Sequence, residues 1–330
     1  MRRTDVFGLL AISLCLLGAD GPKPKLGAKV ERVGDEIIVC GQLIHSTAPV
    51  VLWTDPGGYD AYRVERRFAP WAEASWAMSK DVTALKNPNR FGFRKANLTS
   101  EQIEKVRGGG WDLPELQDVV DQFVIHFDAC GTSRKCFQVL HDERDLSVHF
   151  MLDLDGTIYQ TLDLKEGASH ATKANSRSIG IEIANIGTAK PGPNPKFERW
   201  YVKGDDGEVR IKVPDADKPR DARVVLAPDR PIPIIGEVQG ETLQQYDLTA
   251  AQYDSLIKLT ATLCTVFPKI KPDYPRDKDG NRLLKKIDDE DYKTYKGILG
   301  HYHVQTNKVD PGPAFQWDRL IDGTRQLMNP

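Results

Sequence analysis

Residues 122–127 form the run QFVIHF, in which β-branched and aromatic residues follow one another without a turn-forming residue. Such a run is typical of a buried strand, and a buried strand must pair with other strands in a sheet. The segment SIGIEIANIG at 178–187 predicts a second strand, and GILGHYHV at 297–304 predicts a third. The chain is therefore expected to fold around a sheet to which distant segments contribute.

A helix is predicted after 248, in the sequence DLTAAQYDSLIKLTATLCTVFP. Thr249 and Gln252 have the spacing of a capping box, the apolar residues recur on one face, and Pro268 ends the helix. The segment SVHFMLDLDGTIYQ at 147–160 predicts a β-hairpin that turns at Asp155 and Gly156. Together these elements predict a chain in which strands and helices both contribute to the fold.

The first 19 residues have the pattern of a secretory signal peptide. Two arginines precede an apolar stretch at 6–17, which is too short to span a bilayer, and small residues follow it. A buried N-terminal helix is the alternative. Cys15 lacks the small preceding residue that a lipid anchor requires. We therefore expect an exported chain, periplasmic or extracellular, without a transmembrane segment in the mature protein.

The remaining sequence divides at about residue 120. Residues 20–120 are predicted to be an N-terminal extension, which could be a wall-binding domain, a packing extension of the main domain or a partner site. Residues 121–325 form the main domain, with a surface insertion rich in Pro, Asp and Lys at 188–246. The formal net charge is −2 and the two signs are interspersed, which argues against a nucleic-acid partner. The oligomeric state is not indicated.

Two histidines and an aspartate have the chemistry of a metal site. His126 lies within the predicted buried strand, His301 lies in the predicted third strand, and Asp310 precedes a Pro-Gly-Pro turn. Histidine nitrogens and a carboxylate oxygen are ligands that a catalytic zinc uses, with a fourth position open to water. A lone histidine in a buried strand is more often a core residue, and the spacing from His301 to Asp310 is a weak signal alone.

Four motifs, taken in order, make the chain resemble the type-2 N-acetylmuramoyl-L-alanine amidases, the zinc-dependent family that includes the peptidoglycan recognition proteins. The motifs are FVIHFDA, SVHFMLDLDGTIYQ, GASHATKANSRSIGIEIANIG and GHYHVQTNKVDPGPAF. The resemblance covers roughly 122–185 and 248–317. It implies that family's α/β fold, with helices packed on a central mixed sheet and a zinc cleft at one side, so that 121–325 is an amidase domain. It also implies hydrolysis of the bond between N-acetylmuramic acid and L-alanine in peptidoglycan or muropeptides.

Carried onto this sequence, the resemblance implies that His126, His301 and Asp310 bind Zn²⁺. It also implies that Glu182 and Lys308 are the catalytic residues. Glu182 could accept a proton from the attacking water and pass it to the leaving amine, and Lys308 could stabilise the oxyanion. Alternatives are a module that binds peptidoglycan without cutting it, and a related zinc amidase with another substrate.

Substrate contacts are predicted for His170, on the basis of a cleft-lining position in relatives, and for Asn175, Arg177 and Ser178. His303 lies two residues after His301, so in a strand the two side chains would share a face. His303 is accordingly expected either beside the metal ligands or at the surface.

Cys130 and Cys136 are close enough in sequence to form a disulfide, or they could be free or buried thiols. Their spacing is wider than that of a usual zinc-binding cysteine pair. The resemblance implies the disulfide, because recognition proteins carry one after the first zinc histidine. An exported chain would permit it.

Overall fold

A computed structural model describes residues 26–76, 89–94 and 98–329. The predicted signal peptide and Cys15 therefore lie outside the described residues. From Val33 onward the chain clusters as one compact unit, whose architecture is given below. Within the described ranges, no helix combines the length and the apolar character needed to cross a bilayer.

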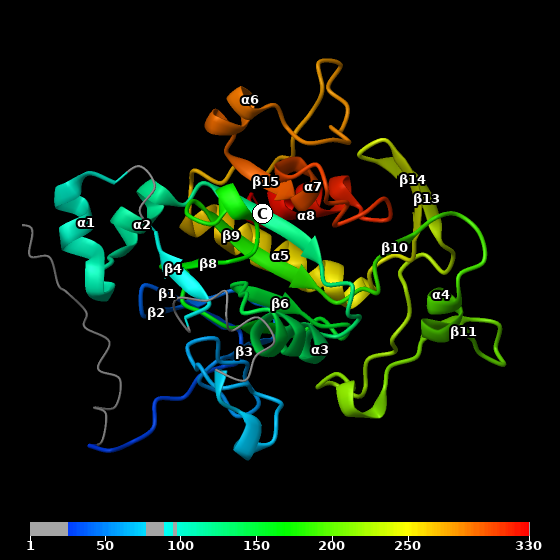
Figure 1. Ribbon diagram of the computed structural model, residues 1–330, viewed down its shortest axis with the longest axis horizontal. Coiled ribbons are helices and arrows are strands. Elements are labelled where there is room, and N and C mark those ends of the chain that lie inside the picture. Colours follow the sequence, from blue (N-terminus) through cyan, green and yellow to red (C-terminus); the bar gives the residue numbers. More distant parts are fainter. Residues whose placement is uncertain (1–25, 77–88, 95–97, 330) are drawn as a thin grey trace, which may run out of the picture. The chain divides into compact units, whose positions relative to one another are not determined.

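A six-stranded mixed sheet organises this unit (Figure 1). The strands, in spatial order, are β15 (Gly297–Gly300), β5 (Gln122–Phe127), β9 (Ser178–Ile183), β6 (Phe150–Leu152), β7 (Ile158–Gln160) and β3 (Val50–Leu52). Strands β15, β5, β9 and β6 are parallel, β7 is antiparallel to β6, and β3 is parallel to β7. The predicted α/β class with a central mixed sheet is confirmed.

The hairpin formed by β6 and β7 also agrees with the prediction. Asp153 N donates to Thr157 O over 2.9 Å, and Gly156 adopts a positive φ of 84° within this turn. A side chain at Gly156 would meet the backbone oxygen of Ala251, 2.7 Å from the added Cβ. Glycine is therefore required both for the turn and for the close approach of the next helix.

Helix α5 (Ala250–Val266) covers one face of the sheet, and α8 (Trp317–Met328) packs beside it. The predicted capping box is present, since Thr249 Oγ1 accepts from Gln252 N and Thr249 N donates to Gln252 Oε1. The buried apolar side chains of this layer come from alternate positions of β5 and β9 and from α5, namely Phe123, Ile125, Ile179, Ile181, Ile183, Leu256, Leu259 and Leu263. The side chains between those positions point to the opposite face.

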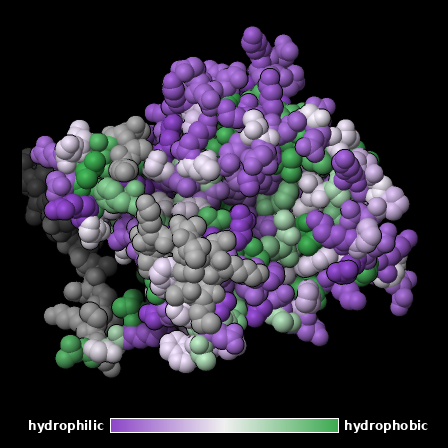
Figure 2. Space-filling model, in the orientation of Figure 1, coloured by the Kyte–Doolittle hydropathy of each residue, from purple (hydrophilic) through white to green (hydrophobic). Residues whose placement is uncertain are grey.

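That opposite face carries one short helix and the turn that follows it. Helix α3 (Ser133–Phe137) and a π-type turn (Gln138–Glu143) pack there, with Cys136 and Phe137 against Met151. Helices α1 (Ser100–Val106) and α2 (Leu113–Val119) precede β5, and β4 (Phe91–Phe93) pairs with β8 (Glu166–Ala168). Figure 2 shows hydrophilic side chains gathered over α6 (Asp289–Thr294) and the segment before it.

Part of the predicted N-terminal extension belongs to this unit. Strand β3 forms one edge of the central sheet, and the hairpin of β1 (Glu36–Val39) and β2 (Gln42–His45) buries Ile37 and Val39 in the main core. The residues of these three strands therefore pack on the same sheet and core as the rest of the unit.

The predicted surface insertion, 188–246, has regular structure of its own. It contains a sheet ordered β10 (Thr188–Ala189), β14 (Glu241–Gln245), β13 (Ile234–Val238). It also contains α4 (Pro195–Trp200) and the hairpin of β11 (Tyr201–Lys203) and β12 (Val209–Ile211).

The predicted strand at 297–304 is wrong in its second half. Strand β15 ends at Gly300, and His301–Val304 forms a single helical turn, α7. Residues two apart on a helix point in nearly opposite directions, so His303 does not share the face of His301. His303 is fully buried: its Nδ1 accepts from Gly300 N, and its Nε2 lies 2.9 Å from Leu283 O. It therefore has a structural place in the core, neither at the metal ligands nor at the surface.

Candidate active site

Two adjacent parallel strands place His126 and Glu182 on the same face of the sheet. The Cα atoms of these residues are register partners between β5 and β9. Because α5 covers the other face, both side chains point away from the main apolar core, toward α3 and the loops around it. Two polar residues inside apolar strands are thus accommodated without entering that core.

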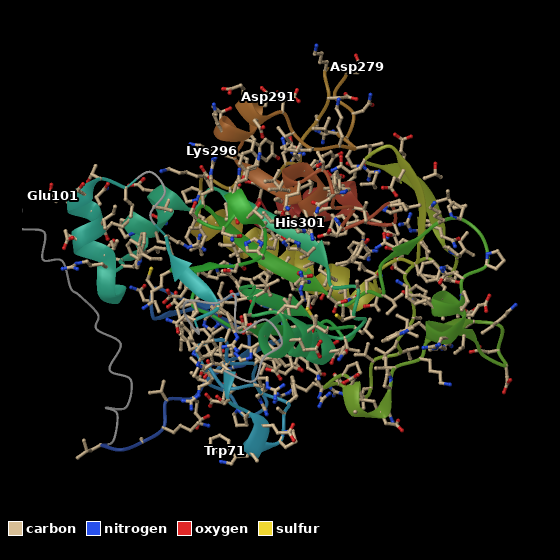
Figure 3. All side chains as sticks on the ribbon, in the orientation of Figure 1. Trp71, Glu101, Asp279, Asp291, Lys296 and His301 are labelled. Carbon is tan, nitrogen blue, oxygen red and sulfur yellow. The ribbon has the colours of Figure 1, made fainter. Side chains whose placement is uncertain are left out.

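His301 and Asp310 reach the same place from the other side of β5. Gly300 pairs with Ile125, so the next residue, His301, lies level with His126. Figure 3 shows His301 in the interior of the ribbon, next to the end of the sheet. Tyr302 N donates to Asp310 O over 3.2 Å, which holds the start of α7 against the segment that carries Asp310.

Three potential metal ligands converge here. His126 Nδ1 lies 2.9 Å from His301 Nδ1 and 2.9 Å from Asp310 Oδ2, and His301 Nδ1 lies 3.0 Å from Asp310 Oδ2. Tetrahedral zinc with ligand bonds of about 2.0 Å has ligand atoms roughly 3.3 Å apart. A small outward adjustment of this buried triangle would fit that geometry, so the residues present fit a zinc ion.

The protonation states also suit a cation. Burial, and after it the neighbouring His301, lowers the pKa of His126 to about 4. Burial opposes ionisation of Asp310, but His301 and His126 outweigh it and hold the pKa of this carboxyl below its ordinary value. A neutral imidazole and an ionised carboxylate are the forms that ligate zinc.

The other ring nitrogens of both histidines have side-chain neighbours. His126 Nε2 lies 3.0 Å from His170 Nδ1, and His301 Nε2 lies 2.7 Å from Gln305 Oε1. Contacts of this kind fix the tautomer and orientation of a ligating imidazole. Gly180 makes room for the His170 ring, because an added Cβ would lie 2.6 Å from it.

A cavity of about 210 Å³ opens beside the three ligands, and both Glu182 and Lys308 line it. Glu182 Oε2 is buried and has no hydrogen-bond partner among the residues that the structure describes. Burial, and then the charges of Asp310 and Asp128, raise the pKa of Glu182 well above its ordinary value. A carboxylate with a free oxygen and a raised pKa, facing a cavity, is suited to exchange protons with a bound molecule.

Asp128 is a cavity residue that the sequence reasoning did not single out. Its Oδ1 accepts from the amides of Cys130, Gly131 and Asn185, while its Oδ2 is buried and has no partner within the described part of the chain. The sequence signal for it is its place two residues after His126 in FVIHFDA. That signal is weak, because an aspartate directly after a strand usually makes a turn.

The predicted substrate-contacting residues lie in different environments. Only His170 among them lines the cavity, and it also contacts His126. Ser178 Oγ lies 3.2 Å from His170 Nε2, and Asn175 Oδ1 accepts from the amides of His170 and Ala171. Ser178 and Asn175 therefore hold His170 and the turn after it.

Arg177 points elsewhere. Its guanidinium makes a two-pronged ion pair with Asp121, with bonds of 2.7 and 2.6 Å, and donates to the carbonyls of Tyr292, Lys293 and Tyr295. These bonds join the start of β5 to the segment before β15. Its donors are thus committed to the protein, and it does not line the cavity.

Cys130 and Cys136 also line the cavity and are free thiols in the structure. A hydrogen bond from Cys136 lowers the pKa of the Cys130 thiol, and burial raises that of Cys136. The disulfide between them stays a prediction.

The chain is similar to one protein family and to several solved structures. A family model described as N-acetylmuramoyl-L-alanine amidase matches residues 116–313. Among solved structures, a selenomethionine derivative of AmpD is 17% identical over 71% of this chain and 89% of its own, with a TM-score of 0.32. AmiD from E. coli, in complex with anhydro-N-acetylmuramic acid-L-Ala-D-γ-Glu-L-Lys, is 18% identical over 62% of this chain and 57% of its own, with a TM-score of 0.34. The endolysin LysCS from Clostridium intestinale is 15% identical over 64% and 86%, with a TM-score of 0.32. No curated protein matches.

Proposed function

This chain belongs to the N-acetylmuramoyl-L-alanine amidase family, and we propose that it is a zinc-dependent enzyme acting on peptidoglycan or its muropeptide fragments. The bond cut would be the amide between the lactyl group of N-acetylmuramic acid and L-alanine of the stem peptide. The observation that carries the proposal is the convergence of His126 Nδ1, His301 Nδ1 and Asp310 Oδ2 beside the cavity that Glu182 and Lys308 also line.

In this proposal His126, His301 and Asp310 hold the zinc. When bound there, zinc would act as a Lewis acid and lower the pKa of a water molecule to about 7. Glu182 would take the proton of the attacking water through its unpartnered Oε2 and then deliver it to the leaving amine of L-alanine. The Lys308 ammonium would stabilise negative charge on the amide oxygen as the carbonyl carbon becomes tetrahedral.

The remaining neighbours keep this arrangement in place. His170 and Gln305 contact the second ring nitrogens of His126 and His301, and so restrain the rotation of both rings. His170 also faces the cavity, where it could touch a substrate as well.

The direct test is cleavage of a defined muropeptide, with mass spectrometry of both products to identify the bond broken. Anhydro-N-acetylmuramic acid-L-Ala-D-γ-Glu-L-Lys, which AmiD binds as its substrate, is a suitable probe. We expect free anhydro-N-acetylmuramic acid and the intact peptide, no reaction after chelation, and recovery with Zn²⁺. Binding of the probe by zinc-loaded protein without cleavage would favour a recognition module. Cleavage of other amides in a substrate panel, with this one left intact, would favour a related zinc amidase.

We also propose export to the periplasm or the extracellular space, which rests on the sequence of residues 1–19. Fractionation of cells that express the full chain tests this, with N-terminal sequencing of the exported protein. A full-length chain retained in the cytoplasm would contradict it.

A further inference from the structure

We propose that the hairpin formed by β13 and β14 is a positioning device for the metal ligands. Two glutamines of this hairpin, Gln239 and Gln245, hold the segments that carry His301 and Asp310. The hairpin belongs to the insertion at 188–246, which lies outside the motifs that resemble the amidase family. The inference rests on the proposed zinc site and assigns to these residues a role that does not involve contact with substrate.

Gln245 is bound to the turn that follows Asp310. Its carboxamide is almost completely buried: Nε2 donates to Pro311 O over 3.0 Å, and Oε1 accepts from Ala314 N over 3.1 Å. Both ends of the turn are thus bonded to one side chain. Nε2 also lies 3.3 Å from Asn185 Oδ1, two residues beyond the end of β9, the strand that carries Glu182.

The backbone at Gln245 is itself well anchored. It pairs with Ile234 of β13 on one side and with Thr188 of β10 on the other, so that Gln245 lies in the central strand of its sheet. A side chain on a central strand is a stiffer support than one on a loop.

The turn after Asp310 packs closely against the hairpin. Gly312 has a φ of +88°, and a Cβ added there would lie 2.1 Å from Gln245 Oε1. A Cβ added at Gly236 in β13 would lie 2.9 Å from Pro313 Cβ. The close packing of the two segments therefore depends on a glycine in each of them.

Gln239 makes the corresponding contacts to α7. It lies with Gly240 in the two-residue turn of the hairpin, where both residues have positive φ. Its Nε2 donates to Tyr302 O and to Gln305 O, each over 2.8 Å. The bond to Tyr302 O fixes the backbone of the helical turn that begins at His301. The bond to Gln305 O fixes the backbone of the residue whose own Oε1 contacts His301 Nε2.

From the same hairpin, Gln239 thus supports the turn that begins at His301, and Gln245 supports the turn after Asp310. Metal affinity depends on the spacing of ligand atoms, and residues that orient ligands typically change it by about 10–100-fold when they are mutated. Loss of either carboxamide would leave buried backbone groups of the ligand segments without a partner and would let those segments move.

The experiment compares zinc affinity, measured by competition with a chromogenic chelator, among full-length wild type, Gln245→Ala, Gln239→Ala and Gln244→Ala. Gln244 is a matched control, because it is a buried neighbour in β14 whose Nε2 donates, among the described residues, to Lys190 O and Gly192 O alone, inside the insertion. We expect Gln245→Ala and Gln239→Ala to weaken zinc binding by about 10–100-fold, and Gln244→Ala to bind as wild type does.

Thermal unfolding of the same proteins separates positioning from general stability. Metal-free Gln245→Ala and Gln244→Ala should both unfold at lower temperature than wild type, while zinc should raise the midpoint less in Gln245→Ala than in Gln244→Ala. Equal zinc affinity in wild type, Gln245→Ala and Gln239→Ala would overturn the inference. If Gln245→Ala does not fold, Gln239→Ala, at a half-exposed turn, decides alone. Wild-type protein that binds no zinc would instead refute the proposed function.

Discussion

His126 and Glu182 lie side by side on two adjacent parallel strands, as register partners between β5 and β9. One is a candidate ligand and the other a candidate proton carrier, and the sheet itself sets the separation between them. A shift of one residue in this register would turn one of the two side chains into the core against α5. The apolar residues on either side of them, such as Ile125 and Ile181, hold the register by packing in that core.

Replacement of Glu182 by Gln should lower kcat by roughly 10²–10⁴-fold, the usual contribution of a general acid–base group. The amide keeps the volume of the side chain but cannot take the proton of the attacking water. Zinc affinity should change little, since the three ligands remain. Steady-state cleavage of a muropeptide and metal titration of the same preparation measure both quantities.

Glu166→Gln is the control for this substitution. Glu166 is likewise half-buried with its pKa raised chiefly by burial, but it does not line the cavity. Its variant should keep wild-type turnover. A Glu182→Gln enzyme as active as Glu166→Gln would show that Glu182 carries no proton in the reaction.

Replacement of Lys308 by Met should lower kcat by roughly 10²–10³-fold, the range found when one group that stabilises an oxyanion is removed. Lys308→Arg should recover part of the loss because it keeps the positive charge. The relevant measurement separates kcat from KM. A rise in KM with kcat unchanged would mean that Lys308 binds substrate and transition state equally, contrary to the assigned role.

The sequence was most informative where a site residue lies in an element that the local residue pattern predicts. His126 lies in a strand that its own apolar run predicts, and the helix at α5 follows from its capping box and spacing. The family motifs indicated His301, Asp310, Glu182 and Lys308, and the structure brings all four to one cavity with His126.

The sequence was less informative where the outcome depends on a distant partner. Arg177 has Asp121 as its partner, 56 residues away along the chain, and no local pattern reveals that pair. His303 was misplaced because a short apolar run suits a strand or a helix equally well, and only packing selects the helical turn. The contacts of Gln239 and Gln245 depend on how the insertion folds back, which its polar composition does not encode.

Cys130 and Cys136 should form a disulfide when the protein is produced in an oxidising compartment. By the loop-entropy estimate, closing the short loop between them would raise the free energy of unfolding by about 2 kcal/mol. Mass spectrometry of the non-reduced protein, after alkylation, should show a loss of two hydrogens in the peptide pair. Denaturant unfolding with and without reductant measures the gain, with Cys136→Ser as the variant that should not respond to reductant. Free thiols in exported protein would contradict the prediction.

His149 should make folding sensitive to acid. Burial, and then the charge of Arg94, lower the pKa of His149 to about 3 from an ordinary value of 6.5. Above 6.5 the imidazole is neutral in both states, so its stabilising contribution is complete. As the pH falls below 6.5, the unfolded chain binds a proton that the folded protein excludes, and stability is lost until the pH reaches the folded pKa. One such proton corresponds to about 1.4 kcal/mol per pH unit.

Denaturant unfolding of metal-free protein is measured at about pH 7 and about pH 5, on either side of the ordinary pKa. The loss of stability between the two should be smaller in His149→Gln than in wild type. Gln cannot titrate and can still accept the hydrogen bond that Gly180 N donates to His149 Nδ1. His45→Gln is the control, because the exposed His45 has its pKa raised by Asp35 and should respond with the opposite sign. Equal pH slopes in wild type and His149→Gln would show that His149 does not remain neutral in the folded protein.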